Sequence, residues 1–176
     1  MNTRPIARAV LLAALLAITV FGAACKSEGK AQDFEIITYQ SGGVLNTQTL
    51  RFQQLLKDKP IVLNFWAGLC GPCRKEMPDF EAAAKKYQGQ VVIVGVDVGP
   101  FTGLGSREEG RNLLKELGVT YPAGTTGDRT VTAKYNVLGM PTTVFIKPDG
   151  TIVRRFLGDL DAEDIEQYIQ ELLKKS

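Results

Sequence analysis

Two cysteines, Cys70 and Cys73, follow closely on an apolar run. Their position limits the folds that this part of the chain can adopt. The run 61–66, IVLNFW, is compact and predicts a buried strand. Pro72 suits the first turn of a helix, so we expect a helix from residue 72 or 73 to residue 87. The cysteine pair therefore lies where a buried strand turns into a helix.

This place at a helix start has chemical consequences for the pair. Backbone N–H groups in the first turn have no partner within the helix, and their partial positive charge favours a thiolate at Cys70. A thiolate is the nucleophile in thiol–disulfide exchange. Cys73 lies one turn on, where the two Cα atoms come within about 5–6 Å, a separation that a disulfide accepts. A redox couple, a structural staple and a metal clip are all compatible with this spacing; in a redox couple Cys70 would attack and Cys73 would resolve.

The chain of 176 residues contains three cysteines and no histidine. Ser-His and Cys-His nucleophile pairs, imidazole metal ligands and a histidine general base are therefore excluded. A closed four-sulfur zinc site within one chain is excluded by the cysteine count. Beyond residue 24 the chain has 19 basic and 19 acidic residues, so its net charge is near zero. This charge gives no indication of nucleic-acid binding.

The N-terminus has the features of an export signal. Arg4 and Arg8 precede the uncharged run 9–24, AVLLAALLAITVFGAA, which is short against the about 20 apolar residues of a membrane span. Cys25 follows small residues and resembles the lipidated cysteine of a bacterial lipoprotein signal. Gly22 stands where such signals prefer a large aliphatic residue, so simple cleavage and an uncleaved anchor are the alternatives. We expect an extracytoplasmic protein tethered to the bacterial membrane, with a soluble exported form as the other outcome.

The remaining pattern predicts a signal (1–24), a polar tether (25–33) and one folded domain (34–176). Predicted strands cover 34–39, 61–66, 91–98, 142–147 and 151–156, and predicted helices cover 50–56, 72–87, 106–118, 128–135 and 161–174. A capping box, Ser106 to Glu109, opens the third helix, and Pro148-Asp149-Gly150 forms the turn of a closing hairpin. The strand–helix–strand order predicts a parallel unit, so we expect a mixed sheet between helices.

Three stretches together, FWAGLCGPC, CGPCRKEMP and GMPTTVFIKPDGTIVRRFLG, resemble a known family. They are similar to the exported, membrane-tethered thiol-disulfide oxidoreductases of the TlpA/ResA-like branch, within the AhpC/TSA-Redoxin superfamily. CxxC alone is a weak motif, but CGPC at a strand-to-helix turn with a distant Gly-x-Pro-Thr is specific. The resemblance covers residues 34–176 and implies an α/β fold: a thioredoxin-like three-layer α/β/α arrangement with a central mixed sheet and an N-terminal β extension.

The resemblance also implies roles for individual residues. Cys70 and Cys73 match the redox pair, which forms a disulfide when oxidised. Pro141 matches a cis-proline that faces the disulfide, and the backbone of Met140 would help to hold an extended substrate segment. Glu76 matches an acidic residue near the pair; a buried carboxylate there would move protons on and off Cys73, with a raised pKa. The alternative for Pro141 is an ordinary trans proline, and the alternative for Glu76 is a solvent-exposed glutamate.

Other matches lie beside the cysteines. Trp66 matches the family tryptophan at the strand end, where it either packs in the core or contacts substrate. Gly71 and Pro72 belong to the motif that would face the substrate. Leu69 departs from the family, which usually has an aromatic residue there. The glycine-rich segment 99–105 lacks the spacing of a phosphate-binding loop, and we expect a mobile loop near the active face.

The resemblance implies an exported enzyme that reduces protein disulfides and needs no cofactor besides the Cys70–Cys73 couple. Its partners would be protein thiol or disulfide substrates, apocytochrome c being one family substrate, and a membrane thiol–disulfide electron donor. The alternative is a Cu(I)-binding assembly module of the same fold, since two thiolates can hold Cu(I). Related copper proteins use a wider cysteine spacing and a histidine, which this chain lacks, so we expect no metal site.

Overall fold

The structure, a computed structural model, describes residues 29–40, 48–56 and 59–174. The apolar run 9–24 and Cys25 lie outside these residues, and with them the predictions of a signal and of lipidation. Among the helices that the structure describes, none is long and apolar enough to cross a membrane.

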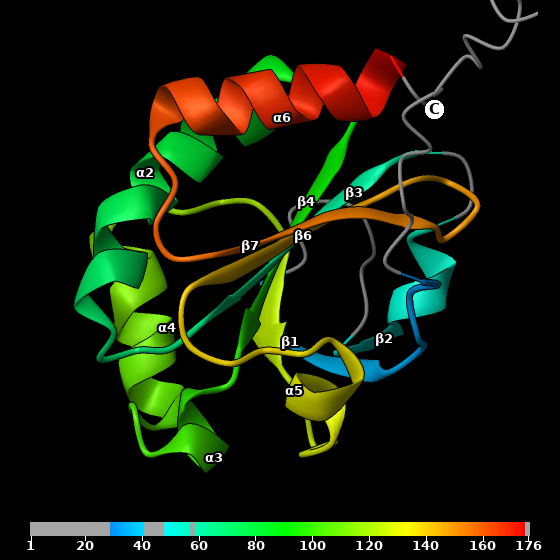
Figure 1. Cartoon of the computed structure of the whole chain (residues 1–176). Coiled ribbons are helices and arrows are strands. Elements are labelled where there is room, and N and C mark those ends of the chain that lie inside the picture. The colour runs from blue at the N-terminus through cyan, green and yellow to red at the C-terminus, as the bar shows by residue number, and fades with distance from the viewer. Residues whose placement is uncertain (1–28, 41–47, 57–58, 175–176) are drawn as a thin grey trace, which may run out of the picture.

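A seven-stranded mixed sheet lies at the centre of the fold, with the strand order β2-β1-β5-β4-β3-β6-β7 (Figure 1). β3, β4 and β5 run parallel, and the remaining neighbours pair antiparallel. The strands are β1 (Glu35–Gln40), β2 (Thr49–Arg51), β3 (Ile61–Trp66), β4 (Val92–Asp97), β5 (Ala123–Thr125), β6 (Thr142–Ile146) and β7 (Ile152–Leu157). The helices are η1 (Phe52–Gln54), α2 (Gly71–Lys86), α3 (Gly99–Thr102), α4 (Arg107–Glu116), α5 (Val131–Lys134) and α6 (Ala162–Lys174).

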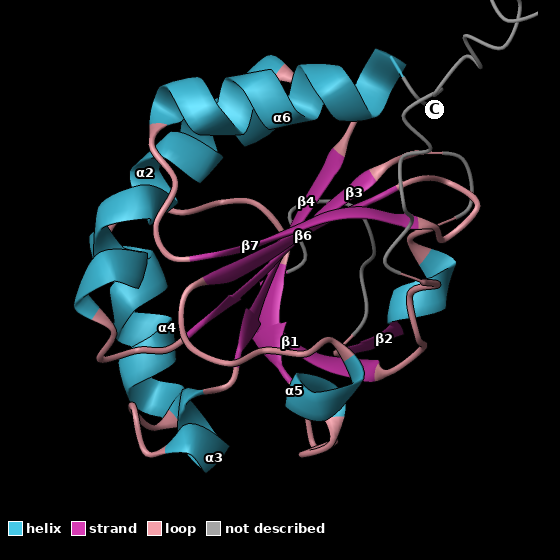
Figure 2. Cartoon of the chain, in the orientation of Figure 1, coloured by secondary structure: helices cyan, strands magenta, loops and turns pink. Residues whose placement is uncertain are grey.

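Helices cover both faces of this sheet (Figure 2). α2, α4 and α6 bury their apolar sides against one face, and η1 and α5 pack against the other. β3 shows the reason, because Val62 and Trp66 belong to the first core while Leu63 and Phe65 belong to the second, all four with 0% exposure. A strand with two buried faces needs a helical layer on each side. The expected three-layer α/β/α fold with a central mixed sheet is confirmed.

The N-terminal β extension is part of the central sheet. The segment near 34–39 forms β1, which pairs antiparallel with β2 on one side and with β5 on the other. The segment 50–56, predicted as a helix, begins in β2 and continues as the short 3₁₀ helix η1. Our prediction of a helix there was therefore only partly right.

Residues 29–33, which we assigned to the tether, already pair with the domain. Lys30 forms an antiparallel bridge with Thr151, and the N–H of Ala31 donates to the carbonyl of Gly150 over 2.8 Å. The N–H of Ile152 donates in turn to the carbonyl of Gly29 over 2.9 Å. The folded part of the chain thus begins before residue 34.

Three strand ends meet at one edge of the sheet and create a place for a site. Trp66, the last residue of β3, is the register partner of Asp97, the last residue of β4. Thr142, the first residue of β6, pairs with Phe65 from the other side. Because α2 begins just beyond β3, its first turn lies over this edge.

Candidate active site

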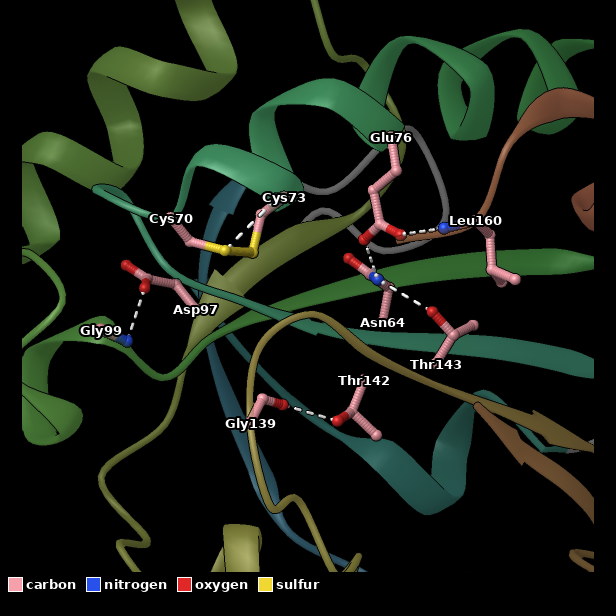
Figure 3. The surroundings of a disulfide bond; sticks show 10 residues. All are labelled: Asn64, Cys70, Cys73, Glu76, Asp97, Gly99, Gly139, Thr142, Thr143 and Leu160. Carbon is pink, nitrogen blue, oxygen red and sulfur yellow. Dashed lines mark hydrogen bonds between the residues drawn. A yellow bond between two sulfur atoms is a disulfide. The ribbon is translucent and has the colours of Figure 1, made fainter. Parts of the chain in front are cut away.

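Cys70 and Cys73 form a disulfide at the start of α2 (Figure 3). Their S–S distance is 2.04 Å and their Cα atoms are 5.3 Å apart. Cys70 is the N-cap of the helix, and its Sγ accepts the N–H of Cys73 over 3.2 Å. Cys70 is 8% exposed whereas Cys73 is fully buried. The pairing expected from the spacing is present, and Cys70 is the sulfur that a partner reaches first.

The local sequence explains this geometry. Gly71 and Pro72 are the first two helical residues, and the proline lacks an N–H in a turn where that group has no helical partner. Cys70 thus points its sulfur at the open N-terminal end of a 16-residue helix. A thiolate at Cys70 would be stabilised by the helix dipole and by the N–H of Cys73. Cys70 therefore has the setting of an attacking thiol.

Glu76 lies one turn beyond Cys73 and is 1% exposed. Its Oε1 accepts the side-chain amide of Asn64 over 2.7 Å, and its Oε2 accepts the N–H of Leu160 over 3.1 Å. Burial raises the pKa of Glu76 to about 7, although both hydrogen bonds act to lower it. The alternative of a solvent-exposed glutamate is wrong, and the site contains a carboxyl group that titrates near neutrality.

Asn64 is a site residue that sequence reasoning missed. It lies on the buried β3, and its amide donates to Thr143 on β6 over 3.1 Å as well as to Glu76. Its side chain thereby connects α2 with two strands beneath the disulfide (Figure 3). The available signal was a single polar residue inside a run of apolar ones, since a fully buried amide requires partners.

The peptide bond between Met140 and Pro141 is cis, as the resemblance implies. Pro141 is buried and its carbonyl accepts the N–H of Gly158 over 2.9 Å, while Met140 is half-buried between the two cores. Thr142 donates its hydroxyl to the carbonyl of Gly139 over 2.6 Å and so closes this turn. The turn lies at the same sheet edge as the disulfide because Thr142 pairs with Phe65.

The remaining predicted residues divide between surface and core. Gly71 and Pro72 are exposed beside the disulfide, where a partner can contact them. Trp66 has 0% exposure, so the structure favours core packing over the alternative of a direct substrate contact. The segment 99–105 contains α3 and is tied to the site, because the carbonyl of Leu104 accepts the N–H of Leu69 over 2.8 Å. The predicted loop is thus held against the residue before Cys70.

The large apolar side chains that are exposed in the described part of the chain gather around this end. They are Leu69 (61%), Leu104 (39%), Leu138 (77%) and Leu157 (56%), here called the leucine rim. Leu69 and Leu104 are joined by the backbone hydrogen bond, and Leu157 pairs with Thr142 beside the cis-proline. Exposed apolar side chains gathered around one site are typical of protein-binding surfaces. Across residues 29–40, 48–56 and 59–174, no three His, Cys, Asp or Glu side chains gather as metal ligands would.

The chain matches the AhpC/TSA family over residues 28–155. It is 36% identical over 115 residues to the thiol-disulfide oxidoreductase ResA of Bacillus subtilis (strain 168), covering 65% of this chain and 62% of that protein. It is 30% identical over 183 residues to ResA of Oceanobacillus iheyensis, covering 97% of this chain and 90% of that protein. The chain thus spans less than two thirds of the Bacillus relative and most of the Oceanobacillus one.

Solved structures share the fold. A putative thiol:disulfide interchange protein DsbE from Chlorobium tepidum has a TM-score of 0.69 and 24% identity, over 84% of this chain and 97% of that one. The pneumococcal exposed lipoprotein thioredoxin Etrx1 from Streptococcus pneumoniae has a TM-score of 0.66 and 26% identity, over 80% of this chain and 99% of that one. Both likenesses agree with the three-layer arrangement of sheet and helices.

Proposed function

This chain belongs to the AhpC/TSA family, and from that membership we propose that it is a thiol-disulfide oxidoreductase that reduces protein disulfides through Cys70 and Cys73. The observation that carries the proposal is the asymmetry of the disulfide. Its outer sulfur caps a helix, and its inner sulfur is fully buried one turn from a carboxyl group with a pKa of about 7. This arrangement provides an attacking thiolate, a resolving thiol and a proton acceptor.

The reaction starts from the reduced pair. The Cys70 thiolate attacks one sulfur of a substrate disulfide, an S–S bond forms between Cys70 and the substrate, and the other substrate sulfur leaves as a thiolate. Cys73 then gives its proton to the Glu76 carboxylate and attacks the Cys70 sulfur. The Cys70–Cys73 disulfide forms and the second substrate thiolate leaves. The substrate gains two electrons, the protein loses two, and a thiol donor must reduce the pair again.

The leucine rim supports a protein substrate. Leu69 directly precedes Cys70 and is hydrogen-bonded to Leu104, and Leu157 pairs with Thr142 next to the cis-proline, so exposed apolar side chains adjoin both the disulfide and the cis-proline turn. Leu69 in place of the usual aromatic residue leaves a smaller apolar surface next to the nucleophile. We propose the heme-attachment cysteines of exported cytochromes as the first substrate to test, and a membrane thiol–disulfide protein as the electron donor.

An extracytoplasmic, membrane-tethered location completes the proposal. It rests on the basic start, the run 9–24 and Cys25, and a structural neighbour is named an exposed lipoprotein thioredoxin. Lipidation at Cys25 predicts that Cys25→Ser moves the protein from the membrane fraction to the soluble fraction. Retention of the variant in the membrane would instead support an uncleaved anchor, and a soluble parent protein would contradict both.

The decisive experiment is a pair of cysteine variants assayed for reduction of insulin disulfides. We expect Cys70→Ser to abolish activity because the attacking sulfur is lost. Cys73→Ser should form a mixed disulfide with substrate and fail to release it, since no resolving thiol is present. Cys25→Ser is the matched control, because it replaces a cysteine outside the redox pair, and it should keep full activity. An active Cys70→Ser protein would overturn the mechanism, and the proteins trapped by Cys73→Ser in cells would identify the substrate.

A further inference from the structure

A second buried carboxyl group, Asp97, lies at the active-site edge and has no part in the mechanism above. It is the last residue of β4, has 0% exposure, and is the register partner of Trp66. Its side chain points to the face that carries α2 and α4, because its Oδ2 lies against Gly110 of α4. A carboxyl group in such a place costs folding free energy unless other groups compensate it.

The compensation comes from two hydrogen bonds. Oδ1 accepts the N–H of Gly99 over 2.9 Å, and Oδ2 accepts the hydroxyl of Tyr39 on β1 over 3.0 Å. The charged groups that face this pair come from α4: Arg107 attracts the carboxylate, and Arg111 lies 4.6 Å above the Tyr39 ring. Among the described residues Asp97 forms no ion pair within 4 Å. Burial raises the pKa of Asp97 to about 6, while the Gly99 and Tyr39 hydrogen bonds and Arg107 lower it.

Packing connects Asp97 to the loop that precedes Cys70. A Cβ atom placed on Gly110 would lie 2.3 Å from Oδ2 of Asp97, and one placed on Gly68 would lie 2.7 Å from the nitrogen of Gly110. Gly110 is therefore enclosed between the carboxyl group and the loop two residues before Cys70. The absence of side chains at both glycines allows this close approach.

A second connection runs along the chain from Gly99. The hydrogen bond from Gly99 to Asp97 fixes the turn from β4 into α3, and the segment that follows presents the carbonyl of Leu104 to the N–H of Leu69. Figure 3 shows the outcome: Asp97 lies on the Cys70 side of the disulfide, and Glu76 lies on the Cys73 side. Two buried carboxyl groups thus flank the two sulfurs.

We propose that Asp97 is a second carboxyl group of the redox site, a positioning residue that holds the loop before Cys70 and sets the thiolate fraction of that cysteine. The inference deepens the proposed function and rests on it, since it concerns Cys70 as a nucleophile. A negative charge beside a thiol disfavours the thiolate, so ionised Asp97 opposes the helix dipole at Cys70. Protonation of Asp97 removes this opposition. At pH values where Asp97 is protonated, the thiolate fraction of Cys70 is therefore higher than the titration of Cys70 alone would give.

The test measures the alkylation rate of Cys70 against pH in the full chain carrying Cys73→Ser. Mass spectrometry of the peptide that contains Cys70 reports the alkylation of that cysteine alone. We expect Asp97→Asn to lower the pKa of Cys70 by about one unit, which is about a tenfold higher alkylation rate below that pKa. In the protein that keeps both Cys70 and Cys73, the same change should make the reduction potential less negative by about 30 mV. Glu108→Gln is the matched control, because it removes one exposed carboxylate from α4 and should leave both quantities unchanged.

Tyr39→Phe provides a second variant if Asp97→Asn does not fold. It removes one donor to the carboxylate and keeps the packing, so Asp97 should take up a proton at higher pH and Cys70 should alkylate faster near pH 6.5. An alkylation profile that is unchanged in a folded Asp97→Asn or Tyr39→Phe protein overturns the inference, because a purely structural role lowers stability without moving the profile. Failure of the proposed function is a separate result. In that case the parent protein does not reduce insulin, whatever the alkylation profile of Cys70.

Discussion

At the residue scale, Glu76 is a buried carboxyl group that accepts hydrogen bonds from Asn64 and Leu160. A carboxyl group with a pKa of about 7 is half-ionised at neutral pH, where it accepts and returns protons with little cost. We expect Glu76→Gln to slow the release of substrate by Cys73 by about 100-fold, the typical size of a general-base effect. The attack by Cys70 should change far less, so mixed disulfide should accumulate.

The measurement is the rate of mixed-disulfide resolution between pH 5 and pH 9 in stopped-flow. The parent profile should rise through an inflection near pH 7, and Glu76→Gln should lack it. Asp79→Asn is the control, because it removes a partly exposed carboxylate from the same helix. Equal resolution rates in the parent and in Glu76→Gln at neutral pH would refute the role of Glu76 as proton acceptor.

Some site residues could be predicted from the sequence and others could not. The roles proposed for Cys70, Cys73 and Pro141 follow from short motifs that report local geometry or family membership. Asn64 and Asp97 have no motif, because their importance arises from partners far along the chain, such as Thr143 for Asn64 and Tyr39 for Asp97. Each appears in the sequence only as a polar residue within or at the end of an apolar strand.

At the element scale, a substitution in helix α4 has two effects on stability with opposite signs: helix propensity and overpacking. Alanine in place of a helical glycine usually stabilises a helix by about 1 kcal/mol. At Gly110 the new Cβ would fall 2.3 Å from Asp97 Oδ2 and 3.2 Å from the ring of Tyr39. We expect Gly110→Ala to destabilise the protein by about 1–3 kcal/mol, because overpacking outweighs helix propensity. Urea unfolding measures the difference.

The control for this prediction lies two residues along the same helix. Asn112 is exposed, so Asn112→Ala should leave stability unchanged or raise it by about 0.5 kcal/mol. Gly110→Ala should also alter the alkylation profile of Cys70, since it displaces Asp97 or the loop before Cys70. A Gly110→Ala protein as stable as Asn112→Ala would show that α4 can shift away from β4 without cost.

Elements with strong local signals were predicted well. The apolar run gives β3 at the expected residues, and the capping box of α4 forms as predicted between Ser106 and Glu109. Strand β5 was missed, because its three residues include Gly124 and no apolar run marks it. A Cβ on Gly124 would lie 2.4 Å from the carbonyl oxygen of Ile37, so this strand exists through its close approach to β1. Such pairing depends on distant residues and leaves no local pattern.

At the scale of the whole molecule, two kinds of ionisable group have opposite effects on how the free energy of unfolding depends on pH. Asp128 pairs with Lys134 and Asp33 with Arg51, both at the surface, and these contacts lower the pKa of each aspartate. In Asp128 the hydrogen bond from Lys134 is the largest cause; in Asp33 the hydrogen bonds from Gln53 and Arg51 outweigh burial. Groups of this kind lose their contribution to stability as the pH falls below about 4, and exposed pairs contribute little.

Glu76 and Asp97 act in the opposite direction over a higher pH range. Burial raises their pKa values from the ordinary 4.5 and 3.8 to about 7 for Glu76 and about 6 for Asp97. The folded protein therefore keeps protons that the unfolded chain loses near pH 4, and the stability gained from them is lost as pH rises to about 7. Each of these increases in pKa corresponds to about 3 kcal/mol. The oxidised protein should be most stable near pH 5, below neutrality.

Urea unfolding of the oxidised protein between pH 4 and pH 8 measures this dependence. We expect the free energy of unfolding to fall by several kcal/mol from pH 5 to pH 8, with an unchanged dependence on urea concentration. Glu76→Gln should remove the part of the decrease near pH 7, and Asp97→Asn the part near pH 6. If each single variant keeps the remaining slope, the two groups titrate independently on the two sides of the disulfide. A free energy of unfolding that is constant or rises from pH 5 to pH 8 would mean that both carboxyl groups are ionised inside the folded protein, and the proton-acceptor role of Glu76 would lose its physical basis.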